Sequence, residues 1–519
     1  MDDHKNYGTI KSGRIKDHKV AHEQDESQSA SQNHSHPATG TVAATRQRTS
    51  AKSNTSTRQS SSSQRRTSTP TSGSGNNRRR LSKKERMRRR RIRKIKALGL
   101  LAALLILCII IIVSIGKFIS GLFNNDDPED KAAKTATSLS VDGQDAPVEE
   151  ATATILATGD AMLHKPFLES STYLASDGSY NYDSIFKYVK DDFEAADFTT
   201  ITFEGSFTDG DYSGYPAFRS PGAFATAFYN SGIDMCLLAN NHIYDNSADG
   251  IQKTISYVEE NNLLYTGVRK STDEKPYQVQ DINGIKVGMI NYVFETERNG
   301  APKAINGIAV SEEAAPLINS FSSEDLDSFY SEMETRLADM KEDGAEFIIA
   351  YMHWGVEYDT VGTDEQREMA QKLCDLGVDA LIGSHPHVIQ PVDLLTSTDG
   401  GHQMVCAYAI GNQVSNQRQE YMQGYSNYGH TEDGYMVELT INRDTKGNVT
   451  LNDADFIPIW LYHSSNGGGE YYVLPLDEPD TLAEKTGLSL GTDVEDSLNR
   501  TNTIISDGVE EVKAALPLS

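Results

Sequence analysis

Two histidines separated by one proline, in the segment Ser384-His385-Pro386-His387, are the residues of this 519-residue chain whose spacing most directly suggests chemistry. The chain has only eight histidines after residue 149, and two of them stand here, directly after an apolar run. Alternate side chains of an extended backbone point the same way, so the sequence predicts that both imidazoles face one pocket. Such a pair could bind a metal ion. The alternative is a surface loop that happens to contain two imidazoles.

Other apolar runs along the chain also end in residues of types that bind metal ions. The run "ATILATG" is followed by Asp160, "FTTITF" by Glu204, and "AEFIIAYM" by His353. A further run, "IDMCLLAN", is followed by Asn241 and His242. Ligands of open α/β sheets bind at the carboxyl ends of the strands, so these five strand ends are expected to meet at one metal centre.

The two carboxylates differ in how strongly they favour a metal. Burying a carboxylate at the end of an apolar strand is costly unless it is paired or binds a cation, which favours a metal-bridging role for Glu204. Asp160 could instead cap a helix that follows it. His164 lies four residues beyond Asp160, and it would reach the same site as a further ligand if residues 161–164 form a helical turn.

Acid–base residues are expected beside the metal ligands. His242 could be a ligand or a general acid, and Asp245 would then orient its imidazole or stabilise the loop. Glu357 lies four residues after His353 and could be a proton donor or a partner of that ligand. Asn412, which follows a glycine after another apolar run, is expected to form an ordinary turn.

The predicted ligand set favours a transition metal. Mixed imidazole, carboxylate and amide ligands suit Mn, Fe or Zn better than Ca or Mg alone. The candidates suffice for one or two divalent ions, and a pair of ions can activate a water and stabilise in-line displacement. The three cysteines after residue 117 lie within apolar patterns and are expected to be buried thiols.

The strands that carry these residues alternate with amphipathic segments. This alternation predicts an α/β domain over residues 151–465, with helices packed over a substantially parallel sheet. An acidic C-terminal extension, residues 466–519, follows this domain. Helices are expected within residues 246–262, 324–343, 364–377 and 494–516.

The N-terminal part of the chain predicts a membrane anchor. Residues 1–96 form a polar, basic tail with the composition of a disordered segment. Arg and Lys occupy 13 of the 19 positions from 78 to 96, and the next 20 residues, 97–116, carry no charge. That length suits one transmembrane helix, residues 97–117, with the tail cytoplasmic and the later domain outside the cell membrane. Residues 118–150 are polar and acidic and are expected to be a linker.

Charge is divided very unevenly along the chain. The net charge is +17 for residues 1–96 and −43 for the remainder. The acidic remainder is expected to repel polyanions and attract cations. Topology and contact with anionic lipids explain the basic block without nucleic acid, so no nucleic-acid partner is expected.

Several motifs of residues 152–415 together resemble one family. They are "TGDAML", "FEGSF", "FRSP", "LANNHIYDNSADGIQKT", "YTGV", "HWGVEY", "IGSHPHVIQPV" and "YAIGNQ", in that order. On these motifs the chain resembles the CapA family, called PgsA in bacteria that produce poly-γ-glutamate. The resemblance implies a domain like that of metallo-dependent phosphatases, with layered sheets and flanking helices.

The resemblance also implies roles for individual residues. Glu204 would bridge two ions and His242 would assist the leaving group. The chain departs from the phosphoesterase pattern at Met162, where a histidine is usual, and at Glu204, where an aspartate is usual. It departs from the family's own pattern at Gln413, where an aromatic residue is usual, and at Thr202-Phe203, where Asn-Leu is usual. The implied metal ligands are Asp160, Glu204, Asn241, His353, His385 and His387.

The function implied is that of a membrane-anchored protein of capsule, poly-γ-glutamate or related envelope-polymer biosynthesis. As an enzyme it would be a metal-dependent hydrolase acting on a phosphoester or a γ-glutamyl amide. The alternative is a non-catalytic accessory subunit that couples polymer synthesis to export, with synthase or export subunits as partners. A ligand-binding or adhesion module has little support, because the chain has no internal repeats.

Overall fold

The computed structural model describes residues 148–425, 427–464 and 469–516. The predicted cytoplasmic tail, the predicted transmembrane helix at 97–117 and most of the predicted linker lie outside these residues. Within the described residues, no helix combines the length and the apolar character needed to cross a membrane.

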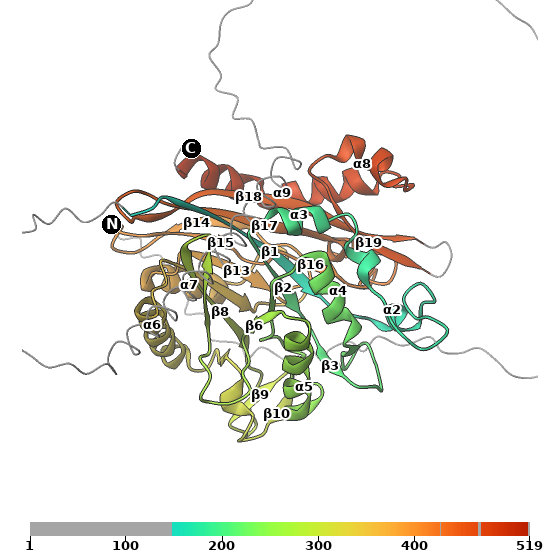
Figure 1. The fold of residues 1–519 in the computed structure, drawn as a ribbon, viewed down its shortest axis with the longest axis horizontal. Coiled ribbons are helices and arrows are strands. Elements are labelled where there is room, and N and C mark those ends of the chain that lie inside the picture. Colours follow the sequence, from blue (N-terminus) through green and yellow to red (C-terminus); the bar gives the residue numbers. More distant parts are fainter. Residues whose placement is uncertain (1–147, 426, 465–468, 517–519) are drawn as a thin grey trace, which may run out of the picture. The chain divides into compact units, whose positions relative to one another are not determined.

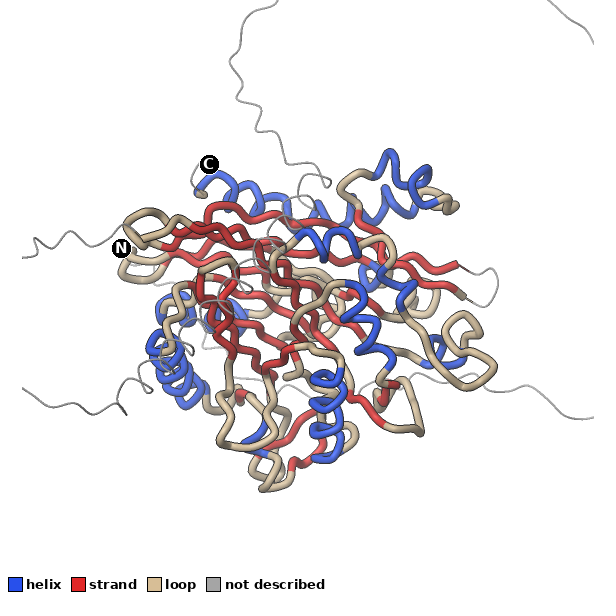
Figure 2. The backbone as a smooth tube through the Cα atoms, viewed as in Figure 1, coloured by secondary structure: helices blue, strands red, loops and turns tan. Residues whose placement is uncertain are grey.

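Two large β-sheets form the centre of the described part of the chain (Figures 1 and 2). The first has the order β19-β18-β17-β1-β2-β5-β6, and β16 pairs with β1 at one end. Its strands are β1 (Ala151–Ala161), β2 (Phe198–Phe203), β5 (Met235–Leu237), β6 (Leu264–Thr266), β16 (Asn412–Val414), β17 (Asp433–Arg443), β18 (Val449–Ser464) and β19 (Glu470–Pro475).

The second sheet has the order β11-β8-β12-β13-β15-β14, with β7 paired to β8. Its strands are β7 (Gln278–Ile282), β8 (Ile285–Phe294), β11 (Ser320–Phe321), β12 (Phe347–His353), β13 (Ala380–Ser384), β14 (Val392–Thr396) and β15 (Gln403–Ala407). Two short ribbons complete the strands, β3 (Ser206–Thr208) with β4 (Arg219–Pro221), and β9 (Lys303–Ile305) with β10 (Ile308–Val310).

The α/β class predicted from the sequence is confirmed, but the expectation of a substantially parallel sheet is wrong. Strands β1, β2, β5 and β6 are parallel, as are β8, β12, β13 and β15. In contrast, β17, β18 and β19 add to β1 as antiparallel neighbours, and β14 and β7 are antiparallel edge strands. Each sheet is therefore mixed, with a parallel part that carries the predicted strand ends.

Apolar side chains point alternately to the two faces of each sheet, which explains why the sheets stack. Ile155 and Ala157 of β1 pack against Ile349 of β12 in a core between the two sheets. Leu156, between them in sequence, points to the opposite face and packs with α4 and α5. On the second sheet, Ile348 faces α6 and α7 in the same way. The layers therefore run helix, sheet, sheet, helix (Figure 1).

The helices begin and end where the sequence favours it. Helix α7 starts with a capping box in which Thr363 accepts from the backbone N–H of Gln366, and it ends at Gly377 in a left-handed conformation. The described helices are α2 (Lys165–Glu169), α3 (Lys190–Ala195), α4 (Ala223–Ser231), α5 (Ser247–Glu260), α6 (Leu326–Glu342), α7 (Asp364–Leu376), α8 (Pro479–Thr486) and α9 (Asp493–Ala515).

The described residues of the predicted C-terminal extension contribute β19, α8 and α9. Helix α9 packs against β14, β17 and β18 and so touches both sheets. Its Gly508 approaches β14 so closely that an added Cβ atom would lie 1.6 Å from the carbonyl oxygen of Val392. Arg500 of α9 donates two hydrogen bonds, of 2.6 and 2.7 Å, to the carboxylate of Asp433 at the start of β17.

Asp433 is expected to make the stability of the fold depend on pH. Burial raises its pKa to about 6, although Arg500 and Ser497 oppose the shift. This carboxyl group stabilises the fold fully below its unfolded pKa of about 4. As the pH rises to about 6 the stabilisation is lost, and the free energy of unfolding falls by about 2 to 3 kcal/mol. Relative to Asp433→Asn, the free energy of unfolding of the wild type, measured with urea from pH 4 to 7, should fall by that amount as the pH rises. A constant difference would contradict the assignment.

Candidate metal centre

The two carboxylates lie at the ends of neighbouring strands. Asp160 is the next-to-last residue of β1 and is paired with Thr202 of β2, and Glu204 follows β2 directly. The preceding Gly159 allows a close approach, because a Cβ atom there would lie 2.0 Å from the carbonyl oxygen of Gly411. Both carboxylates are completely buried. The first sheet therefore supplies two buried carboxylates to one place.

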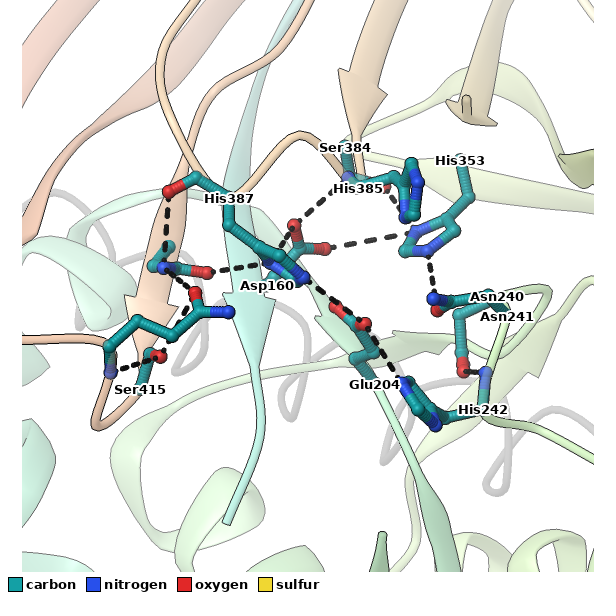
Figure 3. Close-up of polar contacts among 12 residues, drawn as sticks. Asp160, Glu204, Asn240, Asn241, His242, His353, Ser384, His385, His387 and Ser415 are labelled. Carbon is teal, nitrogen blue, oxygen red and sulfur yellow. Dashed lines mark hydrogen bonds and ion pairs between the residues drawn. The ribbon is translucent and has the colours of Figure 1, made fainter. Parts of the chain in front are cut away.

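The second sheet supplies three imidazoles to the same place. His353 ends β12, and His385 and His387 follow β13. The ring centroids of His353 and His385 are 4.9 Å apart, and those of His385 and His387 are 5.9 Å apart. Figure 3 shows these rings arranged around the carboxylates of Asp160 and Glu204.

The backbone that presents the histidine pair is not extended, so that part of the sequence interpretation is wrong. His385 and His387 both have positive φ, +97° and +57°, a conformation that side chains with a Cβ seldom adopt. Two hydrogen bonds made by the backbone of this strained segment hold it in place. The N–H of His385 donates to Asp160 Oδ2 at 3.0 Å, and the carbonyl of Pro386 accepts from the N–H of Tyr358 at 2.8 Å. Strain of this kind is typical of functional sites.

The candidate ligands form two overlapping groups. Glu204, His353 and His385 make one group, and Asp160, Glu204 and His387 make the other. In each group the potential ligand atoms lie within 4.8 Å of one another, and all the residues are buried. Glu204 is common to both, and each group combines residues from both sheets.

The electrostatics of these groups fit a bound cation. Asp160 Oδ1, both carboxylate oxygens of Glu204 and His385 Nδ1 are buried without a hydrogen-bond partner among the described residues. Burial raises the pKa of Asp160 to about 7, and burial together with the charge of Asp160 raises that of Glu204 well above its usual range. Burial also lowers the pKa of His353 and His385, which favours neutral rings that could bind a metal ion. A divalent ion would satisfy the oxygens and compensate their charge.

Neighbouring side chains fix the orientation of the imidazoles. His353 Nδ1 lies 2.9 Å from Ser384 Oγ, and its Nε2 lies 3.0 Å from Asn241 Oδ1. His387 Nδ1 lies 3.2 Å from Asn412 Oδ1. Contacts of this kind orient the rings, and for His387 they leave Nε2, 3.7 Å from Glu204 Oε1, available to a metal ion.

His242 and Asp245 form a hydrogen-bonded pair at the edge of the centre. His242 Nδ1 lies 2.7 Å from Asp245 Oδ2, and the same oxygen accepts from the N–H of Phe218 at 2.7 Å. The other ring nitrogen, Nε2, lies 3.9 Å from Glu204 Oε1. The carboxylate thus holds the ring with Nε2 directed at the candidate metal ligands.

His164 and Glu357 lie near the centre but outside both groups. The helical turn expected at residues 161–164 does not form, because β1 runs to Ala161 and His164 itself is extended. The Nδ1 of His164 accepts from the N–H of Asn416 at 3.1 Å, and burial lowers its pKa to about 3. Glu357 is exposed on the loop after β12, where its charge helps to raise the pKa of Glu204.

Sequence reasoning missed the role of Asn412. The preceding glycine predicts a turn, but Asn412 begins β16, pairs with Asp160 of β1 and faces His387. Its amide nitrogen also donates to the carbonyl oxygens of His387 and Thr431. The signal that could have identified it was its place at the end of the apolar run "MVCAYAIG", the same position that singled out the other candidates.

Two curated relatives align with roughly half of the chain. The PGA biosynthesis protein CapA of Bacillus subtilis (strain 168) is 24% identical over 284 residues, which are 53% of this chain and 65% of the relative. The Capsule biosynthesis protein CapA of Bacillus anthracis is 27% identical over 293 residues, 55% of this chain and 63% of the relative. The chain therefore spans less than two thirds of the length of either relative.

Among solved structures, the sulfate thiohydrolase SoxB of Thermus thermophilus in complex with glycerol aligns with 68% of this chain and 60% of its own, at 12% identity. Its TM-score of 0.32 is too low to support a conclusion. The family model described as "Bacterial capsule synthesis protein PGA_cap" matches residues 154–417, just over half of the chain. That range contains every candidate residue described above. The chain belongs to the bacterial capsule synthesis protein PGA_cap family.

Proposed function

We propose that this protein is a membrane-anchored, CapA-like component of capsule, poly-γ-glutamate or related envelope-polymer biosynthesis with a metal-dependent hydrolase-type site. One observation carries the proposal. Buried carboxylate oxygens of Asp160 and Glu204 without hydrogen-bond partners among the described residues face a set of buried imidazoles. Such an arrangement is costly unless a cation compensates it. The metallophosphatase-like character of the fold belongs to this proposal and rests on the motifs.

The donor set favours one or two ions of Mn, Fe or Zn, held by the two groups that share Glu204. The further ligand in this proposal is Asn241, whose amide oxygen lies beside His353. An ion held there would polarise a phosphoryl or carbonyl oxygen of a phosphoester or γ-glutamyl amide.

Residues of the chain itself would transfer the proton that the leaving group takes up. Asp245 holds His242 through Nδ1, which leaves Nε2 to carry a proton toward the leaving group. Glu357 is exposed beside the centre and could exchange protons with solvent. His164, predicted as a further metal ligand, lies outside both groups, and its ring packs on Phe218, which also packs on His242.

His242→Ala is expected to slow hydrolysis at least about 100-fold while leaving the metal content unchanged. The measurement compares the rate on bis-p-nitrophenyl phosphate and on γ-glutamyl-p-nitroanilide with the metal content of the same samples. His402→Ala is the matched control, because His402 directly precedes β15 and contacts Ser397, Val378 and Asp379, which lie outside the centre. Unchanged hydrolysis in His242→Ala would remove the assigned role.

An accessory role is the second candidate, and the uncharged run at residues 97–116 next to a basic block favours it. In this version the chain couples polymer synthesis to export without catalysis. Absence of hydrolysis by the metal-loaded protein, together with polymer export that depends on the chain, would favour it over the enzyme.

The proposed location is the cell membrane, with the N-terminus in the cytoplasm and residues 118–519 outside. The full chain is expected in the membrane fraction, and a variant lacking residues 97–117 in the soluble fraction. Protease added to intact cells without a wall should cleave only residues after 117. Cleavage of the N-terminal tail under these conditions would reverse the proposed topology.

A further inference from the structure

A pair of tyrosines flanks one side of the candidate metal centre. The ring centroid of Tyr358 is 6.2 Å from that of His387 and 5.1 Å from that of Tyr425. Tyr358 stands on the loop after β12, and Tyr425 stands on the loop after β16. Two loops far apart in the sequence therefore place Tyr358 beside His387 and Tyr425 beside Tyr358. We refer to Tyr358 and Tyr425 as the tyrosine pair.

Tyr358 is held rigidly in an unfavourable backbone conformation. Its φ is +65°, which costs a bulky residue on the order of 1–3 kcal/mol. Its N–H donates to the carbonyl of Pro386, its own carbonyl accepts from Asn427 Nδ2 at 2.9 Å, and its hydroxyl accepts from Gln417 Nε2 at 3.2 Å. The ring is thus positioned before a ligand arrives, which lowers the entropic cost of binding.

The surroundings of the tyrosine pair do not suit a polyanion. Residues 354–363 contain Glu357 and Asp359 and no lysine or arginine. The single guanidinium of residues 415–429, that of Arg418, is buried and lies 3.2 Å from Glu432. These two loops therefore present acidic groups to an incoming polymer. Their described residues include no unpaired lysine or arginine. Carboxylates of a polyglutamate would be repelled here.

The same features suit a neutral, hydroxyl-rich ring. The face of a tyrosine ring packs against the apolar C–H face of a sugar, and its hydroxyl and nearby carboxylates take part in hydrogen bonds with the sugar hydroxyls. We propose that the tyrosine pair forms a subsite for a sugar ring next to the candidate metal centre.

The subsite specifies the substrate class of the centre. A sugar ring against Tyr358 would direct its substituent toward His387, so a phosphate ester of a sugar fits better than a γ-glutamyl amide. This choice of reacting group rests on the proposed function. Binding of the sugar ring itself depends only on the tyrosine pair, so the two can fail separately.

Saturation-transfer NMR on the full chain in detergent tests the subsite, with maltotetraose and chitotetraose as probes and a γ-glutamyl tetramer for comparison. We expect saturation of the protons of at least one saccharide, retained in Tyr358→Phe and about tenfold weaker in Tyr358→Ala. Both variants keep the backbone donor to Pro386. Tyr421→Ala is the matched control, because this tyrosine is 58% exposed on the same loop as Tyr425 but is not a member of the pair.

The metal content of each sample separates this inference from the proposed function. A protein that binds a saccharide but takes up no metal under metal-replete conditions would overturn the metal centre and leave the subsite standing. No saccharide saturation in the wild type, or equal saturation in wild type and Tyr358→Ala, would overturn the subsite. Preferential saturation of the γ-glutamyl probe would do so as well. If Tyr358→Ala does not fold, Tyr425→Ala replaces it, since it removes the neighbouring ring without touching the strained residue.

Discussion

Replacing Glu204 with glutamine is expected to lower the affinity of the protein for divalent metal ions by at least about 100-fold. Glu204 is the residue that both candidate ligand groups share, and its two carboxylate oxygens are buried without a hydrogen-bond partner among the described residues. Glutamine keeps the shape of the side chain but removes the negative charge. Isothermal titration calorimetry of the metal-free protein with Mn²⁺ and with Zn²⁺ measures the change in affinity.

The same substitution should act in the opposite direction on the metal-free fold. Glu204 lies beside a second buried carboxylate, that of Asp160, so removing its charge relieves a repulsion. We expect Glu204→Gln to unfold at the same temperature as the wild type or a higher one in the presence of a chelator. Glu484→Gln, which changes an exposed carboxylate of α8, should alter neither quantity. Wild-type metal affinity in Glu204→Gln would refute the assignment of the centre.

Gly508→Ala is expected to reduce the free energy of unfolding by about 3 kcal/mol or more, at the upper end of overpacking effects. In an exposed helix the same change would add about 1 kcal/mol of stability, because alanine favours the helix. Here the added methyl group would lie 1.6 Å from the carbonyl oxygen of Val392, so α9 or β14 must move. The destabilisation caused by this contact is expected to exceed the stabilisation that alanine gives through its helix propensity.

Urea unfolding of Gly508→Ala beside the wild type measures this effect. Asp507→Ala is the control within the same helix, since Asp507 is exposed and the substitution tests helix propensity alone. A gain in stability for Gly508→Ala would show that α9 does not pack on β14 through this residue.

The sequence was informative where a residue's environment follows from its position on a strand. Asp160, Glu204 and His353 could be singled out because each ends an apolar run, and the ends of parallel strands lie at one edge of a sheet. The relation between the two sheets could not be predicted in this way. Strand β17 continues the first sheet as an antiparallel neighbour of β1, almost 300 residues away, and no local pattern encodes that pairing.

Contacts that depend on tertiary structure account for the other places where the structure differs from the sequence-based prediction. The left-handed backbone of His385 and His387 is maintained by Asp160 and Tyr358, which lie far from the pair or on another loop. Asn412 looked like a turn residue because Gly-Asn is common in turns, and only the packing of β16 on β1 brings it to His387. Tyr358 ends the motif "HWGVEY", but its strain and its position beside His387 arise only from the folded loops.

The division of each ligand group between two sheets has a mechanical consequence. If the centre holds a metal, the ion is a cross-link between layers that are also joined by their shared core, by α9 and by the hydrogen bond from His385 to Asp160. Sliding one sheet past the other by a single residue, about 3.3 Å, would separate the carboxylates from the imidazoles. Metal affinity would then report how the layers are aligned, and substitutions deep between them, such as at Ile349, would weaken binding without touching a ligand.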